Sequence, residues 1–435
     1  MTLIADSAEL QAFCARLAEA DYITVDTEFL RDSTYWPKLC LLQLAGPGEE
    51  DVAAVDPLAE GLDLAPVFAL FDDPKIVKVL HSARQDMEIF YHMSGRLPAP
   101  IFDTQVAAMV CGFGESVGYD TLARKLTGAQ IDKSSRFTDW SRRPLAQRQF
   151  AYALADVTHL RKIYKKLARR LEKSGRASWL DEEMAILTSP ETYRLEPDEA
   201  WKRLKTRSND RRYLAVLRAL ATWREVEAQQ RDVPRGRVLR DEQLFDIAAH
   251  RPTGEDELSR SRGISRDLAR GRIGKAILET VTGALALPDG DLPKPPPTQK
   301  SINGIGPLMD LLKVMLKLRC EEHDVAQKLI ASSADLEQIA MSDEAEVLAL
   351  RGWRYEIFGR DALALKHGAV ALSASGSKVR VVPVGGADKS EAAGAADKRQ
   401  AVGAADKRQA VGAADKRQAV GAADKRQAVG AVEKH

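Results

Sequence analysis

Strand-like and helix-like segments alternate along the first third of the chain, and this alternation restricts the possible folds more than any other feature. Apolar runs typical of strands cover residues 22–25, 39–44, 52–56 and 76–80. The apolar spacing of helices is found at residues 6–19, 64–71, 106–110, 119–126 and 145–171. Alternation of this kind predicts an α/β domain in which helices pack on a mixed sheet.

The composition limits the functions that the chain can perform. Its 435 residues are enough for about two to four domains. The net charge is only +1, so any site for a polyanion has to be a local patch. The four cysteines have neither a Cys-x-x-Cys nor a zinc spacing, which is typical of reduced thiols in the cytosol. We expect a cytoplasmic protein without signal peptide or membrane helix.

The remainder of the chain is predicted to form helical domains and a tail. Helical patterns cover residues 201–204, 213–229, 241–250 and 267–287, and then 305–320, 324–330, 335–341, 343–350 and 356–367. A proline-rich linker separates the two groups at residues 288–297. The predicted domains are therefore residues 1–190, 198–287 and 300–372, followed by a tail at 373–435.

The tail contains a nine-residue repeat that begins at Gly394 and recurs at Gly403, Gly412 and Gly421. Its only large apolar residue is one valine per copy, so it cannot bury enough surface to offset the entropy of ordering. We expect a disordered segment, either a neutral repeat expansion or a basic tether for RNA or a partner.

Two acids follow the first strand-like run at a spacing that suggests chemistry. Asp26 and Glu28 are two residues apart on a strand and therefore share a face. Neighbouring carboxylates resist ionisation unless a cation lies between them, and hard oxygen ligands favour Mg²⁺ or Mn²⁺. An acidic turn exposed to solvent is the alternative reading of this pair alone. Further acids follow later, with Asp86 on a helix after a strand end and Asp156 one turn after Tyr152 on a long helix.

These residues carry a resemblance to a known superfamily. Residues 25–29 (Val-Asp-Thr-Glu-Phe), 81–86 (His-Ser-Ala-Arg-Gln-Asp) and 152–156 (Tyr-Ala-Leu-Ala-Asp) resemble the three exonuclease motifs of the tyrosine-bearing DEDD branch. Residues 29–37 and 138–145 resemble bacterial ribonuclease D more narrowly. The resemblance implies a ribonuclease-H-like mixed-sheet exonuclease domain followed by two all-α domains of the HRDC type, the second diverged.

The resemblance also implies the roles of the site residues. Asp26, Glu28, Asp86 and Asp156 would hold two divalent ions, Mg²⁺ or Mn²⁺. Two such ions about 3.5–4 Å apart stabilise both the attacking and the leaving oxygen of a phosphodiester. Tyr152 would orient the attacking water, because a phenol of pKa about 10 is a poor base at neutral pH.

Several other residues are weaker candidates. Phe29 could stack on a terminal base or simply pack in the core, and Thr27 is a further expected substrate contact. Arg143, together with Lys133, Arg136 and Arg142, could meet phosphates or form an ordinary solvated surface. His81 fits a strand-end residue better than a base, and Asp103 fits a helix N-cap. A local basic excess in the first helical domain comprises Lys202, Arg203, Lys205, Arg207, Arg211, Arg212, Arg235, Arg237 and Arg240.

The predicted function is a 3′→5′ exoribonuclease that trims structured RNA, with tRNA precursors as the family's substrate class. It would release nucleoside 5′-monophosphates and would need neither a membrane nor an obligate protein partner. A DNA exonuclease could use the same acids, but no polymerase or helicase segment accompanies them here. A non-catalytic RNA-binding protein on a decayed nuclease fold is the other alternative, and the intact acids and tyrosine argue against it.

Overall fold

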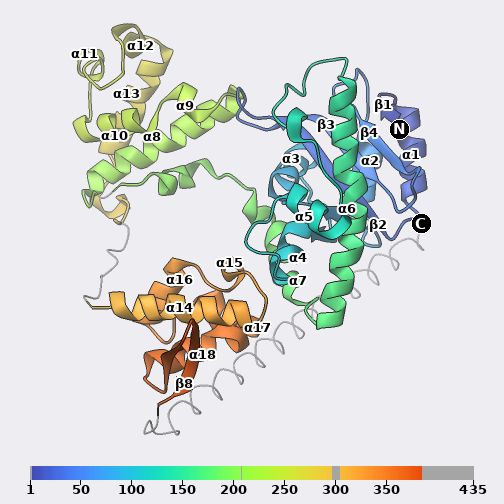
Figure 1. The fold of residues 1–435 in the computed structure, drawn as a ribbon. Coiled ribbons are helices and arrows are strands. Elements are labelled where there is room, and N and C mark those ends of the chain that lie inside the picture. The colour runs from blue at the N-terminus through green and yellow to red at the C-terminus, as the bar shows by residue number, and fades with distance from the viewer. Residues whose placement is uncertain (1, 207, 296–303, 385–435) are drawn as a thin grey trace, which may run out of the picture. The chain divides into compact units, whose positions relative to one another are not determined.

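A six-stranded mixed sheet forms the centre of the N-terminal domain in the computed structural model, which describes residues 2–206, 208–295 and 304–384 (Figure 1). Its strands are β1 (Thr2–Ile4), β2 (Tyr22–Leu30), β3 (Lys38–Ala45), β4 (Val52–Val55), β5 (Val77–Leu80) and β6 (Ile101–Asp103), in the order β1-β4-β3-β2-β5-β6. The inner strand β2 pairs antiparallel with β3 and parallel with β5. The predicted α/β domain with a mixed sheet is confirmed. The short strands β1 and β6 were not predicted.

Helices cover both faces of this sheet. One face packs against α1 (Ser7–Leu17), α2 (Ala65–Asp72) and α3 (Arg84–Ser94), whose apolar side chains join those of β1, β2 and β4 in one core cluster. The long helix α6 (Gln147–Ser174) covers the other face and shares a second cluster with β3 and β4. Two further helices, α4 (Thr104–Val110) and α5 (Tyr119–Thr127), pack against α6.

Helix α6 starts two residues later than its sequence pattern predicted. Leu145 was expected to begin the helix after Pro144, but Ala146 has extended backbone and is the N-cap. The Gln149 side chain reaches back and accepts a hydrogen bond from the Ala146 backbone N–H at 3.0 Å, which satisfies a group at the helix start. The helix is tied to the sheet further along, where the buried Thr24 hydroxyl of β2 donates to the Val157 carbonyl at 2.9 Å.

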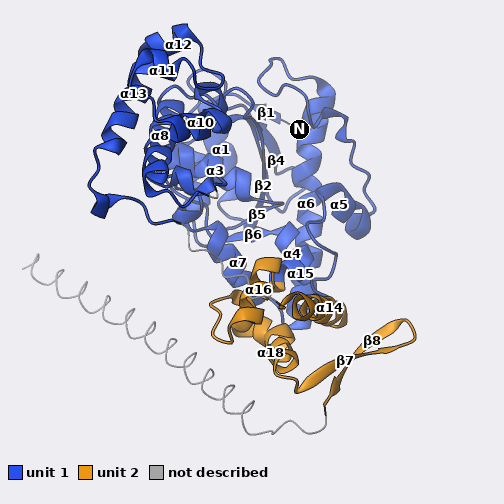
Figure 2. Ribbon diagram, turned by 90° about the vertical axis from the view of Figure 1, so that its left-hand side faces the viewer, with its two compact units in different colours: residues 1–301, 324–329 blue, residues 302–323, 330–435 orange. Residues whose placement is uncertain are grey.

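A helical domain follows in the same compact unit, which comprises residues 1–301 and 324–329 (Figure 2). Its elements after the sheet domain are α7 (Trp179–Leu187), short 3₁₀ turns at Pro190–Thr192 and Pro197–Arg203, α8 (Arg211–Gln230), α9 (Arg235–Val238), α10 (Asp241–His250), α11 (Glu255–Leu258), α12 (Arg266–Arg270) and α13 (Arg272–Leu285). Apolar residues of α8, α10 and α13 form one buried core. Helix α7 was not predicted, and the segment expected at 267–287 is divided at Gly271 into α12 and α13.

The loop between β2 and β3 fastens the sheet domain to the helical domain. Tyr35 is 8% exposed, and its hydroxyl donates a short hydrogen bond to the buried Glu225 carboxylate of α8. The Asp232 carboxylate accepts hydrogen bonds from the backbone N–H groups of Tyr35 and Trp36, both at 3.0 Å. The Trp36 ring stacks on His92 of α3 with centroids 4.1 Å apart. We call Tyr35 and Trp36 with these partners the aromatic latch.

The second compact unit contains residues 302–323 and 330–435. Its described elements are α14 (Gly306–Glu322), α16 (Ser333–Met341), a 3₁₀ turn (Leu348–Leu350), α17 (Gly352–Arg354), one π-helical turn (Tyr355–Gly359), α18 (Arg360–Lys366), β7 (Val370–Ser375) and β8 (Lys378–Pro383), while α15 (Gln327–Ile330) spans the boundary between the units. The helix expected at 343–350 is reduced to the 3₁₀ turn.

The expected start of the tail at residue 373 is wrong in the described part of the chain. Strands β7 and β8 pair antiparallel through residues 370–383 and so continue past that boundary. Valines alternate along β8 in the period-2 pattern of a strand, and this signal was overlooked beside the repeats. The proline-rich stretch beyond residue 295 and the repeats expected to be disordered lie outside the described residues.

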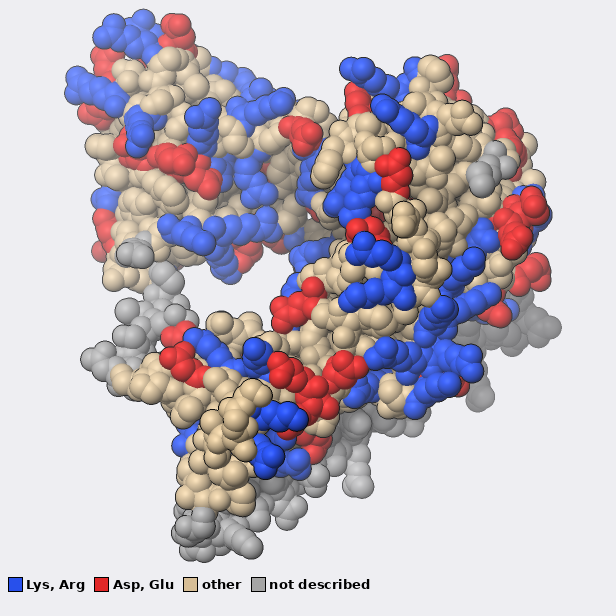
Figure 3. Space-filling model, in the orientation of Figure 1, with Lys and Arg blue, Asp and Glu red and all other residues tan. Residues whose placement is uncertain are grey.

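Three further predictions from composition concern membrane-spanning helices, the state of the cysteines and the surface charge. Within residues 2–206, 208–295 and 304–384, no helix is both long and apolar enough to cross a bilayer. All four cysteines are free and buried, as expected of reduced thiols. Acidic and basic side chains intermingle over the face shown in Figure 3, in keeping with the net charge of +1.

Candidate active site

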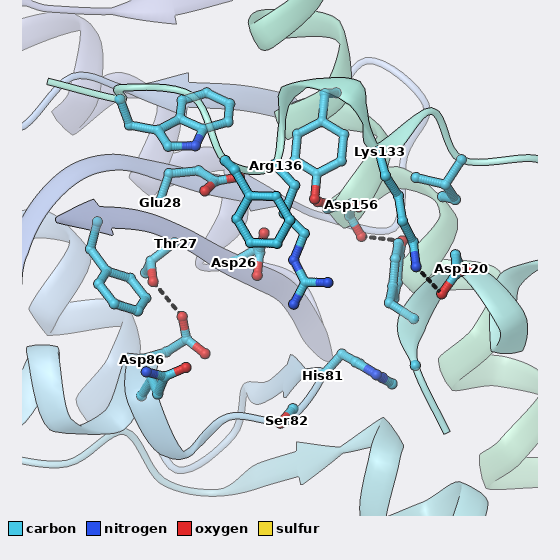
Figure 4. Close-up of a pocket in the computed structure, with 18 of the residues that line it drawn as sticks. Asp26, Thr27, Glu28, His81, Ser82, Asp86, Asp120, Lys133, Arg136 and Asp156 are labelled. Atoms are coloured by element: carbon cyan, nitrogen blue, oxygen red, sulfur yellow. Dashed lines mark hydrogen bonds and ion pairs between the residues drawn. The ribbon is translucent and has the colours of Figure 1, made fainter. Parts of the chain in front are cut away.

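Three carboxylates from two distant parts of the sequence meet on one face of the sheet (Figure 4). Asp26 and Glu28 share a face of β2, and Asp156 reaches them from α6, which crosses that face. One oxygen from each of the three lies within 4.8 Å of the others. The strand period places the first two, and the packing of α6 on β2 adds the third. We call Asp26, Glu28 and Asp156 the acidic cluster.

Asp86 lines the same pocket, which has a volume of about 610 Å³, but lies outside the acidic cluster. It is on the first turn of α3 and is 7% exposed. The Thr27 hydroxyl donates a short hydrogen bond to its carboxylate. The carboxylate of Asp103 fixes the start of α3 because it accepts hydrogen bonds from the N–H groups of Ser82 and Ala83 at 3.0 and 2.8 Å. The fourth predicted acid is therefore held beside the other three by strand and helix contacts.

Crowding of buried acids perturbs their titration strongly. Burial, then repulsion from Asp156 and Asp86, raises the pKa of Glu28 to about 9. Burial raises the pKa of both Asp86 and Asp156 to about 7. The pKa of Asp26 lies well above its ordinary value because the carboxyl is buried and faces the other three acids. The pocket therefore favours protons or cations over free negative charge.

Two tyrosines support Asp156. The Tyr152 phenol hydrogen-bonds to the Asp156 carboxylate, which works against the rise of that group's pKa. Burial, followed by the nearby carboxylates, raises the pKa of Tyr152 above its usual value, so the phenol keeps its proton at neutral pH. On the neighbouring helix α5, Tyr119 donates to the backbone carbonyls of Ala155, at 3.2 Å, and of Asp156. Tyr119 thereby positions the helix turn that carries Asp156, a role that the sequence did not indicate.

Positive charge reaches the pocket from the loop at residues 131–143, which we call the basic loop. The Arg136 guanidinium points towards the acids in Figure 4 and lowers the pKa of Glu28 and Asp156 against the effect of burial. Lys133 also lines the pocket and forms an ion pair with Asp120 at 2.6 Å. These are the two basic-loop cations that line the pocket.

The other predicted contacts have mixed positions. Phe29 lines the pocket and also packs against the core, so the structure is compatible with both of its predicted roles. Arg143 does not line the pocket; its guanidinium bonds to both oxygens of Asp56 at 2.6 Å and to the Cys40 carbonyl at 2.7 Å. These bonds give Arg143 the position of a loop anchor, in contrast to the substrate contact that we expected. His81 follows β5 and places its Nδ1 3.0 Å from the Thr104 hydroxyl.

The basic residues of the helical domain are partly neutralised. Lys202, Arg212 and Arg235 pair with Glu199, Asp289 and Glu225, respectively. Arg203, Lys205, Arg237 and Arg240 are exposed, while Arg207 lies outside the described residues. What remains is a smaller patch than the sequence count suggested.

Two aromatic residues of the basic loop were overlooked as parts of the site. Trp140 is 2% exposed, and its ring packs 6.1 Å from that of Tyr152. Phe137 also lines the pocket but is 91% exposed. The segment that contains them is marked in the sequence by its basic residues, and no periodicity marks an aromatic residue in a loop.

Comparison with known proteins agrees with this geometry. Residues 1–172 match the family described as 3′-5′ exonuclease, and residues 213–281 match the HRDC domain. The chain is 51% identical to ribonuclease D of Granulibacter bethesdensis over 385 residues, or 88% of this chain and 97% of that protein. It belongs to the ribonuclease D family.

Other members of the ribonuclease D family support the assignment. The enzyme of Gluconacetobacter diazotrophicus is 52% identical over 88% of this chain and 96% of its own length. The crystal structure of Escherichia coli RNase D superposes with a TM-score of 0.73 at 31% identity and covers 84% of this chain and 98% of that chain. The chain is accordingly a hydrolase, a 3′→5′ exoribonuclease that acts on RNA.

The exonuclease domain implies the use of a divalent metal ion, and the acidic cluster fits one. Its donors are carboxylate oxygens alone, the ligands that Mg²⁺ and Mn²⁺ prefer. Within the described part of the chain, the buried Oδ1 of Asp156 has no hydrogen-bond partner. Such an oxygen is costly to bury unless a cation or a proton satisfies it.

Proposed function

We propose that this exoribonuclease trims the 3′ ends of structured RNA, tRNA precursors in particular, by hydrolysis assisted by two divalent ions. The observation that carries the proposal is the convergence of Asp26, Glu28 and Asp156 within 4.8 Å, with Asp86 and Tyr152 lining the same pocket. The relative from Escherichia coli is described as an exoribonuclease involved in structured RNA processing, which supports the substrate class.

Asp26, Glu28, Asp86 and Asp156 are the residues that would hold the ions. A bound pair of Mg²⁺ or Mn²⁺ ions supplies activation of water and neutralisation of charge on the scissile phosphate. Water oxygen then bonds to phosphorus as the bond from phosphorus to the 3′ oxygen of the preceding nucleotide breaks. The products are a nucleoside 5′-monophosphate and an RNA shortened by one residue, with a free 3′ hydroxyl.

Tyr152 takes part as a positioning group that keeps its proton. Its raised pKa disfavours a phenolate base near neutral pH. The phenol oxygen can accept a hydrogen bond from the attacking water while its own O–H donates to the Asp156 carboxylate, which fixes the direction of attack. Arg136 and Lys133 line the pocket where the phosphate would lie and can offset its charge.

The helical domain restricts how an RNA approaches this pocket. The aromatic latch begins three residues after the pocket-lining Asp32, so the helical domain is fastened close to the pocket. A base-paired stem that contacts the exposed arginines of this domain would extend its single-stranded 3′ end into the pocket. This arrangement favours RNA with a short 3′ tail on a helical stem.

A direct assay uses a stem-loop RNA with a 3′ tail and the DNA counterpart, each with Mg²⁺ and with chelator. We expect stepwise shortening of RNA from its 3′ end with Mg²⁺ only, with 5′-monophosphates as products. Asp26→Ala is the matched inactive control, and its thermal melt should show that it is folded. Equal shortening of DNA, or activity that survives chelation, would contradict the proposal.

A further inference from the structure

Phe137 is an exposed aromatic residue at the pocket of an otherwise well-packed domain. Its side chain is 91% exposed, and it lines the pocket beside the acidic cluster. An aromatic ring left in water forgoes the stabilisation that burial would give, so the residue is not there to support the fold. Its position at the pocket points to a ligand of this site.

The backbone on the N-terminal side of Phe137 is held firmly. Asp132 caps a 3₁₀ turn through the N–H of Ser134 at 2.9 Å, and Lys133 is paired with Asp120. Ser135 is 1% exposed. The residues just before the exposed ring are therefore anchored to the domain.

The C-terminal side of the same residue is equally well fastened. The Thr138 hydroxyl donates to the Ser135 carbonyl at 2.7 Å and accepts a hydrogen bond from Gln149 at 2.9 Å. Trp140 is buried, and Arg143 closes the loop on Asp56. A rigid loop that presents one exposed ring loses little entropy when a partner stacks on that ring.

The neighbouring charge suits a nucleotide. The Arg136 guanidinium lies 5.2 Å from the centre of the Phe137 ring and also faces the carboxylates. A flat apolar face next to a cation matches a base next to its phosphate, and stacking on such a face tolerates any base. We infer that Phe137 is a stacking platform for the base of the 3′-terminal nucleotide, next to the phosphate that Arg136 faces. This inference rests on the proposed function.

The test compares two RNAs that differ only in whether the 3′-terminal nucleotide has a base or is abasic. Binding is measured with Ca²⁺ supplied in place of Mg²⁺, and gels check that the RNA stays intact. Phe137→Ala should weaken binding of the RNA with the base by about fivefold to a hundredfold, the range for loss of one stacked base. It should leave binding of the abasic RNA unchanged, because the removed contact involves only the base.

A spectroscopic signal tests stacking directly. The fluorescence of an RNA that ends in 2-aminopurine should be quenched when it binds to the unaltered protein or to Phe137→Trp. The quenching should be much weaker when it binds to Phe137→Ala. Ile186→Ala removes a side chain of α7 that is 45% exposed and does not line the pocket, and it should match the unaltered protein. Because Phe137 is so exposed, melting temperatures should agree among all variants.

The outcomes separate this inference from the proposed function. Suppose that the unaltered protein shortens RNA, but Phe137→Ala weakens the binding of both RNAs equally or of neither. The stacking platform is then refuted, while the nuclease assignment stands. If the unaltered protein does not shorten RNA with Mg²⁺, the proposed function fails on its own evidence. If the protein binds neither RNA, both fail.

Discussion

Binding of a divalent cation to the acidic cluster should expel protons from the protein near neutral pH. Glu28, with a pKa of about 9, is protonated at pH 7, and Asp86 and Asp156, each with a pKa of about 7, are about half protonated. A cation needs ionised carboxylates, so these protons must leave when it binds. The structure therefore predicts the release of about two protons at pH 7.

The pH dependence has a definite sign. Metal affinity should rise about a hundredfold per pH unit near pH 7, because the logarithmic slope equals the number of protons released. It should level off above about pH 9 as Glu28 ionises without help. In the metal-free protein these raised pKa values contribute stability that is fully present when the pH is below the ordinary pKa of a carboxyl. That contribution is lost as the pH rises through about 7 to 9, and added metal should restore it.

Calorimetry can count the protons. Mn²⁺ or Mg²⁺ is titrated into chelator-treated protein in two buffers of different ionisation enthalpy, and the difference in heat gives the number released. Glu28→Gln should release about one proton fewer at pH 7. Asp132→Asn alters an exposed aspartate whose pKa is already lowered by its hydrogen bonds to Ser134, and it should change nothing. Release of fewer than about half a proton from the unaltered protein would refute the reasoning.

Three further substitutions, one of them with a matched control, test individual contacts. Tyr152→Phe should bind metal and RNA normally but lose about a hundredfold or more of single-turnover rate; wild-type turnover at saturating Mg²⁺ would show that the phenol has no role. Arg143→Ala leaves its aspartate partner, which is 9% exposed, without a counter-charge and should cost about 3 kcal/mol in chemical denaturation. Arg142 is 84% exposed, so Arg142→Ala should change the unfolding free energy by no more than about 0.5 kcal/mol. Equal losses of stability in the two variants would argue against Arg143 as a loop anchor. Tyr35→Phe leaves a buried carboxylate oxygen unsatisfied and should lower the unfolding free energy by about 1–2 kcal/mol; an unchanged denaturation midpoint would contradict this.

The acids were predictable because each belongs to a local pattern. Asp26 and Glu28 follow a buried run at strand spacing, and Tyr152 and Asp156 share a helix face. The convergence of these patterns was supplied by the resemblance to a family, since spacing alone does not place α6 across β2. Asp86 shows the same limit, because the Thr27 hydroxyl that holds it comes from another element 59 residues away.

The features that sequence reasoning missed depend on contacts distant along the chain. Strands β1 and β6 contain three residues each and are defined by pairing with β4 and β5, so no period is visible in them. Arg143 reads as one of several loop cations until Asp56, 87 residues earlier, is seen to hold it. For Phe137 the signal is its exposure at the rim of the pocket beside Arg136, and no sequence pattern shows it.

The aromatic latch has a consequence for anyone who divides this chain. The strand that contributes Asp26 and Glu28 continues into the loop whose Tyr35 and Trp36 are covered by the helical domain. A fragment that stops before α8 would leave Tyr35 facing water and the Trp36 ring without part of its cover. Such a nuclease fragment would keep every acid and still be prone to self-association, so poor behaviour in solution should not be read as a defect of its catalytic centre.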